Sequence, residues 1–136
     1  MSGATSVWAG KALDFLTGRA VAYTAPRNVY LALMIADPGD PADLTTLAEV
    51  STPGYARQQV VWTAPTGAPM TTQNNSLLFY GPFTSDMTDS ATHAVLVTSA
   101  SGTTGDVIYI WPIADPLLAV TNESLQIAAG SLTLNA

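Results

Sequence analysis

The clearest hydrophobic pattern in the chain is the run N-V-Y-L-A-L-M-I-A-D-P at 28–38. Odd positions from Val29 to Ile35 fall on one face of a strand, and even positions from Tyr30 to Met34 fall on the other. Both sets are apolar, so each face needs a partner in the same domain or in another chain. The pattern predicts the central strand of an all-β domain.

Further short apolar segments follow along the chain. The segment 106–113 is apolar on both faces and indicates a second interior strand. Other strands are predicted at 55–63, 76–80, 92–98, 117–121, 124–128 and 131–134. Residues 20–27 lead into the central strand, 64–75 form a polar loop, and Asp115-Pro116 marks a turn. About seven or eight short strands are typical of an antiparallel β-sandwich.

Residues 3–19 carry a helical pattern. Thr5 or Ser6 suits the N-terminal cap, and Gly18 suits the C-terminal cap. One apolar stripe at helical spacing comprises Trp8, Ala12, Phe15 and Leu16. The stripe needs an apolar partner, which is either the sandwich of the same chain or a neighbouring subunit. Both alternatives remain open.

Size and composition bear on the surface of the domain. The 136 residues fit an N-terminal helix or arm at 1–20 and a single β-sandwich domain at 21–136. Charged residues make up 10% of the chain, against about 25% in ordinary soluble domains. An uncharged surface is cheap to desolvate, which favours burial in an assembly. The alternative is a soluble protein with an exterior rich in Thr and Ser.

Charge and hydropathy exclude several partners. The net charge is −6 with four basic residues, which argues against nucleic acid and against an anionic membrane surface. No apolar run has the length of a membrane span, and the N-terminus lacks the pattern of a secretory signal. With no cysteine, the chain has neither disulfides nor thiolate metal sites.

Candidates for catalysis or metal binding are few. His93 is the only histidine and no nucleophile-elbow motif is present, so we expect a structural histidine and no enzyme activity. Asp37, Asp40 and Asp43 lie in the long turn-rich connection 37–54. Their spacing does not match a calcium loop, so a solvated loop is favoured and a cation site stays open. No cofactor and no small-molecule substrate are expected.

Arg57 is the strongest candidate for a specific polar contact. Its planar guanidinium can hold a carboxylate such as Glu49, or loop carbonyls, and the alternative is an exposed arginine at a sheet edge. Tyr55 and Gln58 belong to the same motif. The aromatic residues expected in the core are Trp62, Tyr80, Tyr109 and Trp111. The residues expected at an interface are Trp8, Phe15, Leu16, Tyr30 and Met34.

Several of these segments together resemble a known family. The run at 29–38, the pair Glu49-Val50 and the motif G-Y-A-R-Q at 54–58 are similar to small virion proteins of tailed bacteriophages. The pair Thr92-His93 and the ending L-Q-I-A-A-G-S-L-T-L at 125–134 extend the resemblance over nearly the whole chain. The chain departs from the family pattern at Val95, Thr98 and Asn122-Glu123.

The resemblance implies a non-enzymatic structural protein of a phage particle. Proteins of this family are often labelled tail fibre proteins, and some are capsid decoration or minor capsid proteins. We expect decoration of the capsid surface, with the phage major capsid protein or further copies of the chain as partners. The alternative is a tail fibre or tail-tip module that attaches to a host glycan.

Overall fold

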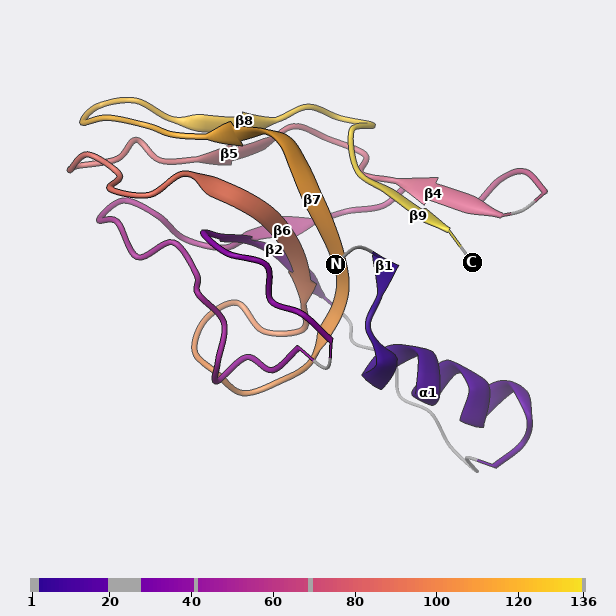
Figure 1. Ribbon diagram of the computed structural model, residues 1–136. Coiled ribbons are helices and arrows are strands. Elements are labelled where there is room, and N and C mark those ends of the chain that lie inside the picture. Colours follow the sequence, from indigo (N-terminus) through magenta and orange to yellow (C-terminus); the bar gives the residue numbers. More distant parts are fainter. Residues whose placement is uncertain (1–2, 20–27, 41, 69, 136) are drawn as a thin grey trace.

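The computed structural model describes residues 3–19, 28–40, 42–68 and 70–135. In these residues the chain forms antiparallel strands in a sandwich-like arrangement, with one short helix to the side (Figure 1). The predicted all-β fold with an N-terminal helix is confirmed. The predicted lead-in at 20–27 lies outside the described residues.

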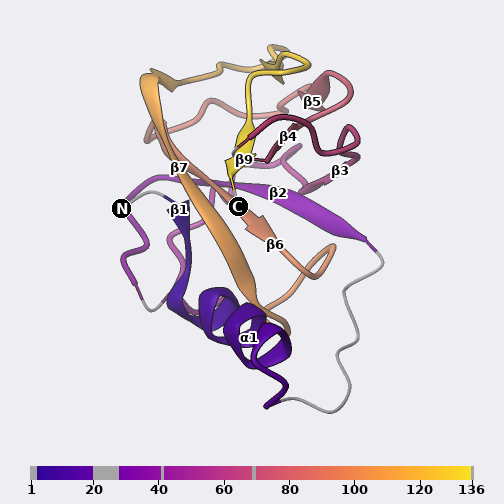
Figure 2. The ribbon, with the colours of Figure 1, turned by 90° about the vertical axis from the view of Figure 1, so that its right-hand side faces the viewer.

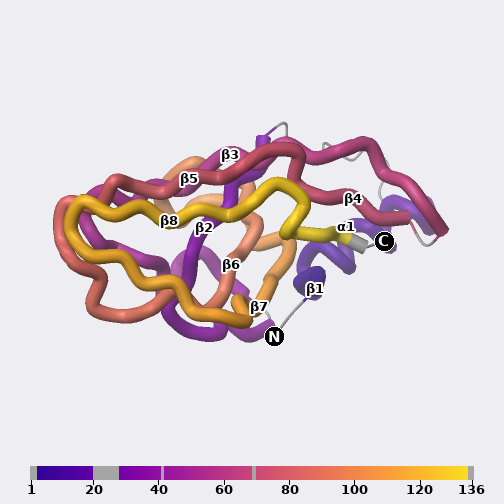
Figure 3. The backbone as a smooth tube through the Cα atoms, turned by 90° about the horizontal axis from the view of Figure 1, so that it is seen from above, coloured from indigo at the N-terminus to yellow at the C-terminus, as the bar shows by residue number. Residues whose placement is uncertain are grey.

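The larger layer is a five-stranded sheet. Its strands, in spatial order, are β1 (Gly3–Ala4), β7 (Val107–Leu117), β6 (Ala91–Val97), β2 (Val29–Met34) and β3 (Gln58–Val60). Two strand pairs lie over it, β5 (Leu78–Tyr80) with β8 (Leu125–Ile127), and β4 (Thr71–Gln73) with β9 (Thr133–Asn135). Figure 3 shows the β5–β8 pair from above, crossing over β2 and β6, and the β4–β9 pair extending beyond it on the side of α1.

The central strand β2 has a core on each of its faces, as its apolar pattern predicts. Leu31 and Leu33 belong to the main core, which lies against β5 and β8. Ala32 and Met34 belong to a second core, which the connection at 42–47 covers with Ala42 and Leu44. All four β2 residues have 0% exposure. Met34 therefore offers no surface to a partner, and its prediction as an interface residue is wrong.

Strand β7 is longer than its sequence predicts. It continues to Leu117 through Pro112 and Pro116, so the turn predicted at 115–116 and the strand predicted at 117–121 are wrong. On one edge β7 pairs with β6, and on the other edge β1 pairs only with Tyr109 and Ile110. A proline lacks the N–H that a central strand donates, but it fits a strand edge that no neighbour covers.

Two short strands were not predicted. β4 lies inside the segment predicted as a polar loop, and β1 precedes the helix within the segment predicted as helical. Each is only two or three residues long, and each pairs with a strand that is distant in the sequence, β9 or β7. Local patterning does not reveal such pairings because they depend on tertiary contacts.

Helix α1 (Ser6–Leu16) is shorter than the predicted segment and is anchored differently at its start. The Thr5 side chain makes no cap; its Oγ1 donates to the carbonyl of Val107 at 2.6 Å. The Asp40 carboxylate instead accepts from the backbone N of Ser6 at 3.1 Å and from its Oγ at 2.8 Å. Gly18 follows the helix with φ +75°, the left-handed conformation expected of a C-terminal glycine. Figure 2 shows α1 at the end of β7, away from β5.

Candidate functional site

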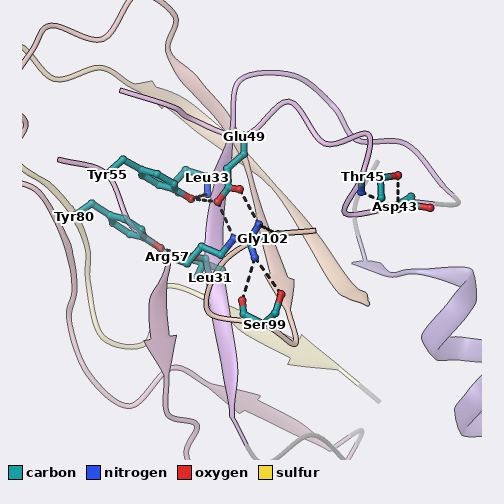
Figure 4. A network of polar contacts seen from close by, with 10 residues as sticks. All are labelled: Leu31, Leu33, Asp43, Thr45, Glu49, Tyr55, Arg57, Tyr80, Ser99 and Gly102. Carbon is teal, nitrogen blue, oxygen red and sulfur yellow. Dashed lines mark hydrogen bonds and ion pairs between the residues drawn. The ribbon is translucent and has the colours of Figure 1, made fainter. Parts of the chain in front are cut away.

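The Arg57 guanidinium is the centre of a polar network beside β2 (Figure 4). Its Nε and Nη2 donate to the two carboxylate oxygens of Glu49, each at 2.9 Å. Nη1 also donates to the carbonyl of Ser99 at 3.1 Å, and Nη2 to the carbonyl of Gly102 at 2.8 Å. Only 6% of the Arg57 side chain is exposed. The arginine thus holds both kinds of partner that its sequence context suggested, a carboxylate and loop carbonyls.

Two stacked tyrosines extend the network into the core. The Tyr55 hydroxyl donates to Glu49 Oε2 at 2.7 Å and accepts from the backbone N of Leu33 at 2.9 Å. Tyr80, which is fully buried, donates to the carbonyl of Leu31 at 2.8 Å. The two rings lie 5.8 Å apart and nearly parallel. Burial raises the pKa of both tyrosines, and the nearby Glu49 carboxylate raises it further, so both stay neutral.

The Glu49 carboxylate also stabilises the charged form of the Arg57 guanidinium. The hydrogen bonds from Arg57 to Glu49 raise the pKa of the guanidinium above its ordinary value. The network connects the segment at 49–57, the β6–β7 connection and the backbone of β2. Gln58 takes no part in it, because its Nε2 donates to the carbonyl of Ala56. The hydrogen bonds of this network hold the loops against one another, which is a structural role.

The other polar candidates are spread over the described residues. His93 Nε2 lies 3.8 Å from Asp37 Oδ2, beyond hydrogen-bond distance, and its Nδ1 lies 3.0 Å from Thr92 Oγ1. Asp43 accepts from the N and Oγ1 of Thr45, both at 2.8 Å, which lowers the pKa of its carboxyl. Within the described ranges, no three His, Asp or Glu side chains are grouped in a way that could hold a metal ion. Among the same residues, no helix has the length and apolar character needed to cross a membrane.

Three of the predicted core aromatics, Trp62, Tyr109 and Trp111, form a row in which neighbouring rings pack together. The Trp62 and Trp111 rings are stacked with centroids 6.1 Å apart, and Tyr109 lies 4.6 Å from Trp111. Trp111 Nε1 donates to the carbonyl of Thr133 at 3.0 Å. The three rings are half-buried against the main core. They contact one another, which suits core packing better than an open platform for a sugar ring.

Helix α1 leaves its apolar side chains at the surface. None of its residues is buried, and Leu13, Phe15 and Leu16 are 60, 55 and 76% exposed. Beside the helix lies a groove of about 640 Å³ between α1, the β4–β9 pair and β7. Its walls and floor include Trp8, Ala12, Met70, Ile108, Tyr109 and Leu134. We call α1 together with this groove the N-terminal face.

The N-terminal face gathers most of the predicted interface residues. Trp8 lines the groove and is half-buried, and Phe15 and Leu16 are exposed on α1. Tyr30 is half-buried against the second core, in a different part of the molecule. The helical stripe indicated this surface from sequence, but its opposite wall at Met70 and Leu134 was missed. Those two residues come near α1 only through the pairing of β4 with β9.

Comparison with known proteins identifies a family for the chain. The family model described as "Podophage GP4 fiber I protein gp80" matches residues 3–135. The match spans nearly all of the 136 residues, so the chain belongs to this family of tailed-phage virion proteins labelled as fibre proteins. No curated protein sequence matches the chain.

Proposed function

We propose that this member of the podophage fibre family is a non-enzymatic structural protein that joins the phage particle by protein–protein contact through its N-terminal face. The family places it among fibre-type proteins of the virion. To this we add the surface through which the chain is held in the particle, and a role that involves no catalysis.

The observation that carries this proposal is the concentration of exposed apolar side chains. Ten large hydrophobic residues are exposed in the described part of the chain, and five of them lie on α1 or on the facing groove wall. They are Val7, Leu13, Phe15, Leu16 and Met70. Single exposed apolar residues are ordinary, but four of them on one helix of 11 residues, beside an apolar groove, favour an interaction surface.

The family description favours a position in a tail fibre, and we propose this position first. Fibres are built by repeated protein–protein contact, which the N-terminal face supports. Decoration of the capsid surface is the second candidate. It is favoured by the low content of charged residues, 10% of the chain, because such a surface is easily desolvated against capsid subunits. Under this second candidate the partner is the phage major capsid protein.

Electron cryomicroscopy of the intact particle tests both positions. Density for this fold in an appendage of the tail, in few copies, supports the fibre position, and hundreds of copies on the head support decoration. Particles that lack the protein should lose adsorption in the first case and resistance to heat or osmotic shock in the second. Purified particles that contain no copy of the protein would contradict both candidates.

A further inference from the structure

A small pocket lies beside the Arg57 network, between the segment at 49–57 and the β6–β7 connection. Its volume is about 270 Å³, and it shares no lining residue with the groove of the N-terminal face. Glu49, Arg57 and Ser101 are polar residues of its wall, and Tyr55 and Ala100 add apolar surface. Sites for drug-sized ligands usually have about 300–1,000 Å³, so this pocket fits a smaller group, such as a single ring.

The Arg57 guanidinium has no donor left for a ligand in this pocket. A guanidinium carries five N–H donors, and here they are matched by five acceptors. Nε and Nη2 donate to the Glu49 carboxylate, Nη2 also donates to the carbonyl of Gly102, and Nη1 donates to the carbonyl and hydroxyl of Ser99. A carboxylate or phosphate ligand therefore finds no free guanidinium donor.

Two oxygens of the pocket wall can still accept a hydrogen bond. A carboxylate has about four acceptor positions, and Glu49 uses three of them: Oε2 accepts from Tyr55 and Arg57, and Oε1 accepts from Arg57 alone. The carbonyl of Gly102 accepts from the same Arg57 nitrogen as Oε1, at 2.8 and 2.9 Å (Figure 4). Because they share one donor atom, the two oxygens lie side by side. The pocket thus suits a ligand with two adjacent donors.

The charges around the pocket favour a neutral ligand. The Glu49 carboxylate is paired with Arg57, so the pair adds no net charge with which to hold a cation. An anion meets a chain of net charge −6. A sugar ring carries adjacent hydroxyl donors without charge, and its C–H groups can pack on Tyr55 and Ala100. A peptide backbone has one N–H per residue, so it supplies two adjacent donors less readily.

The Arg57 network also fixes the geometry of the pocket in advance. Arg57 is only 6% exposed, and it bonds the β6–β7 connection at Ser99 and Gly102, on either side of the exposed Ser101. Loops held by a rigid scaffold often carry binding residues. A site that is ordered before binding also loses less conformational entropy when the ligand arrives.

We propose that this pocket binds one neutral sugar unit, with two adjacent ring hydroxyls donating to Glu49 Oε1 and to the carbonyl of Gly102. Arg57 acts as a positioning residue, since it holds both acceptors but does not itself bond the sugar. The inference goes beyond the proposed function, in which a different surface holds the chain in the particle.

Saturation-transfer NMR with simple sugars tests the site. The probes are the methyl glycosides of glucose, galactose, mannose, rhamnose and N-acetylglucosamine at millimolar concentration. At least one of them should receive saturation from the protein. N-acetylalaninamide represents a peptide and should receive none. Absence of a signal from every sugar, or a signal from the amide alone, overturns the proposal.

Two tryptophan variants locate the binding. Ser101→Trp fills the pocket, and Thr104→Trp is the matched control, because Thr104 is exposed in the same connection but does not line the pocket. Ser101→Trp should weaken binding of the sugar at least tenfold, and Thr104→Trp should leave it unchanged. Circular dichroism checks that both variants are folded. Unchanged binding by Ser101→Trp, or an equal loss in both variants, contradicts the assigned pocket.

Mono-O-methyl derivatives of the sugar that binds test the paired hydroxyls. Methylation of either of two adjacent hydroxyls removes a donor and should weaken binding at least tenfold, whereas methylation elsewhere on the ring should have less effect. A uniform response at every position contradicts the two-acceptor geometry. None of these results depends on how the chain is held in the particle. Electron cryomicroscopy tests that separately, so failure of the sugar site and failure of the proposed function are distinguishable.

Discussion

At the residue scale, Arg57 makes the densest set of polar contacts. Four of its hydrogen bonds go to the Glu49 carboxylate and to two loop carbonyls, and the side chain is almost completely removed from solvent. A guanidinium suits such a site because its planar fork carries several donors in fixed directions. A lysine ammonium has the same charge but cannot satisfy both carboxylate oxygens and both loops from one position.

Arg57→Lys should therefore lower the free energy of unfolding by about 2–3 kcal/mol, because Glu49 and the loop carbonyls lose donors. Urea denaturation followed by tryptophan fluorescence measures this loss. Arg19→Lys is the matched control, since the Arg19 side chain is 79% exposed and its ion pair with Asp14 lies at the surface. The control should change stability by less than about 0.5 kcal/mol. Equal losses in the two variants would show that the network contributes nothing specific.

Two exposed carboxyls set the expected response to acid. Hydrogen bonds from the N and Oγ1 of Thr121 lower the pKa of Asp86, and those from Thr45 lower the pKa of Asp43. Because the pKa of each is lower in the folded state, the stabilisation is present above the ordinary pKa of about 3.9. It is lost as the pH falls through the folded-state pKa.

The melting temperature should consequently fall as the pH drops below about 4. Calorimetry between pH 2 and pH 6 measures the decline. Asp86→Ala should be less stable than the wild type at neutral pH and should lose less on acidification, because one of the titrating groups is gone. An identical acid response in the variant would exclude Asp86 as a contributor.

At the element scale, the loop that contains Gly54 packs closely against the backbone of the segment at 82–84. Gly54 has φ +99°, and a Cβ built there would lie 2.5 Å from the carbonyl oxygen of Pro82 and 2.8 Å from the Cα of Phe83. Both contacts are to backbone, which cannot move aside as a flexible side chain can. Gly54 therefore permits the contact between its own loop and the segment that follows β5.

Gly54→Ala should destabilise the protein by more than about 2 kcal/mol, from left-handed backbone strain together with the clash. Gly39→Ala is the control, because Gly39 has φ +71° but nothing within 4 Å of a built Cβ. The control should cost only about 1 kcal/mol, for the backbone strain alone. Thermal melts of the two variants provide the comparison, and a smaller loss at Gly54 than at Gly39 would contradict the assigned clash.

At the scale of the whole molecule, the described chain divides into a well-buried body and a weakly held helix. β2 and β6 contain nine fully or almost fully buried residues, whereas α1 contains none. The helix is held by the pairing of β1 with β7, by Thr5, and by the polar contacts of Ser6 and Lys11. We therefore expect α1 to open more readily than β2 and β6.

Amide hydrogen exchange of the chain should show this division. Amides of α1 should exchange by local opening, well before those of β2 and β6, which need global unfolding. Mass spectrometry of the exchanged protein resolves the two regions. Protection of α1 equal to that of β2 would show that the helix is an integral part of the folded body.

The candidate site was partly predictable from sequence. Arg57 is one of four basic residues, and Glu49 lies close to it along the chain, so their pairing followed from the sequence as one of the alternatives. The acceptors at Ser99 and Gly102 did not, because they reach Arg57 through a connection more than forty residues away. The burial of Met34 was missed for a similar reason, since a polar, proline-rich loop folds back over it.

By itself, the sequence determined the all-β class, the two-faced central strand and the apolar stripe of α1. Each of these is a property of side-chain periodicity, which the chain carries locally. The tertiary structure alone decided that β7 runs through two prolines, that β4 and β1 exist, and that the stripe of α1 stays at the surface beside a groove. These features depend on which distant segment lies alongside. Pairing and burial are properties of contacts between segments, and no single segment encodes them.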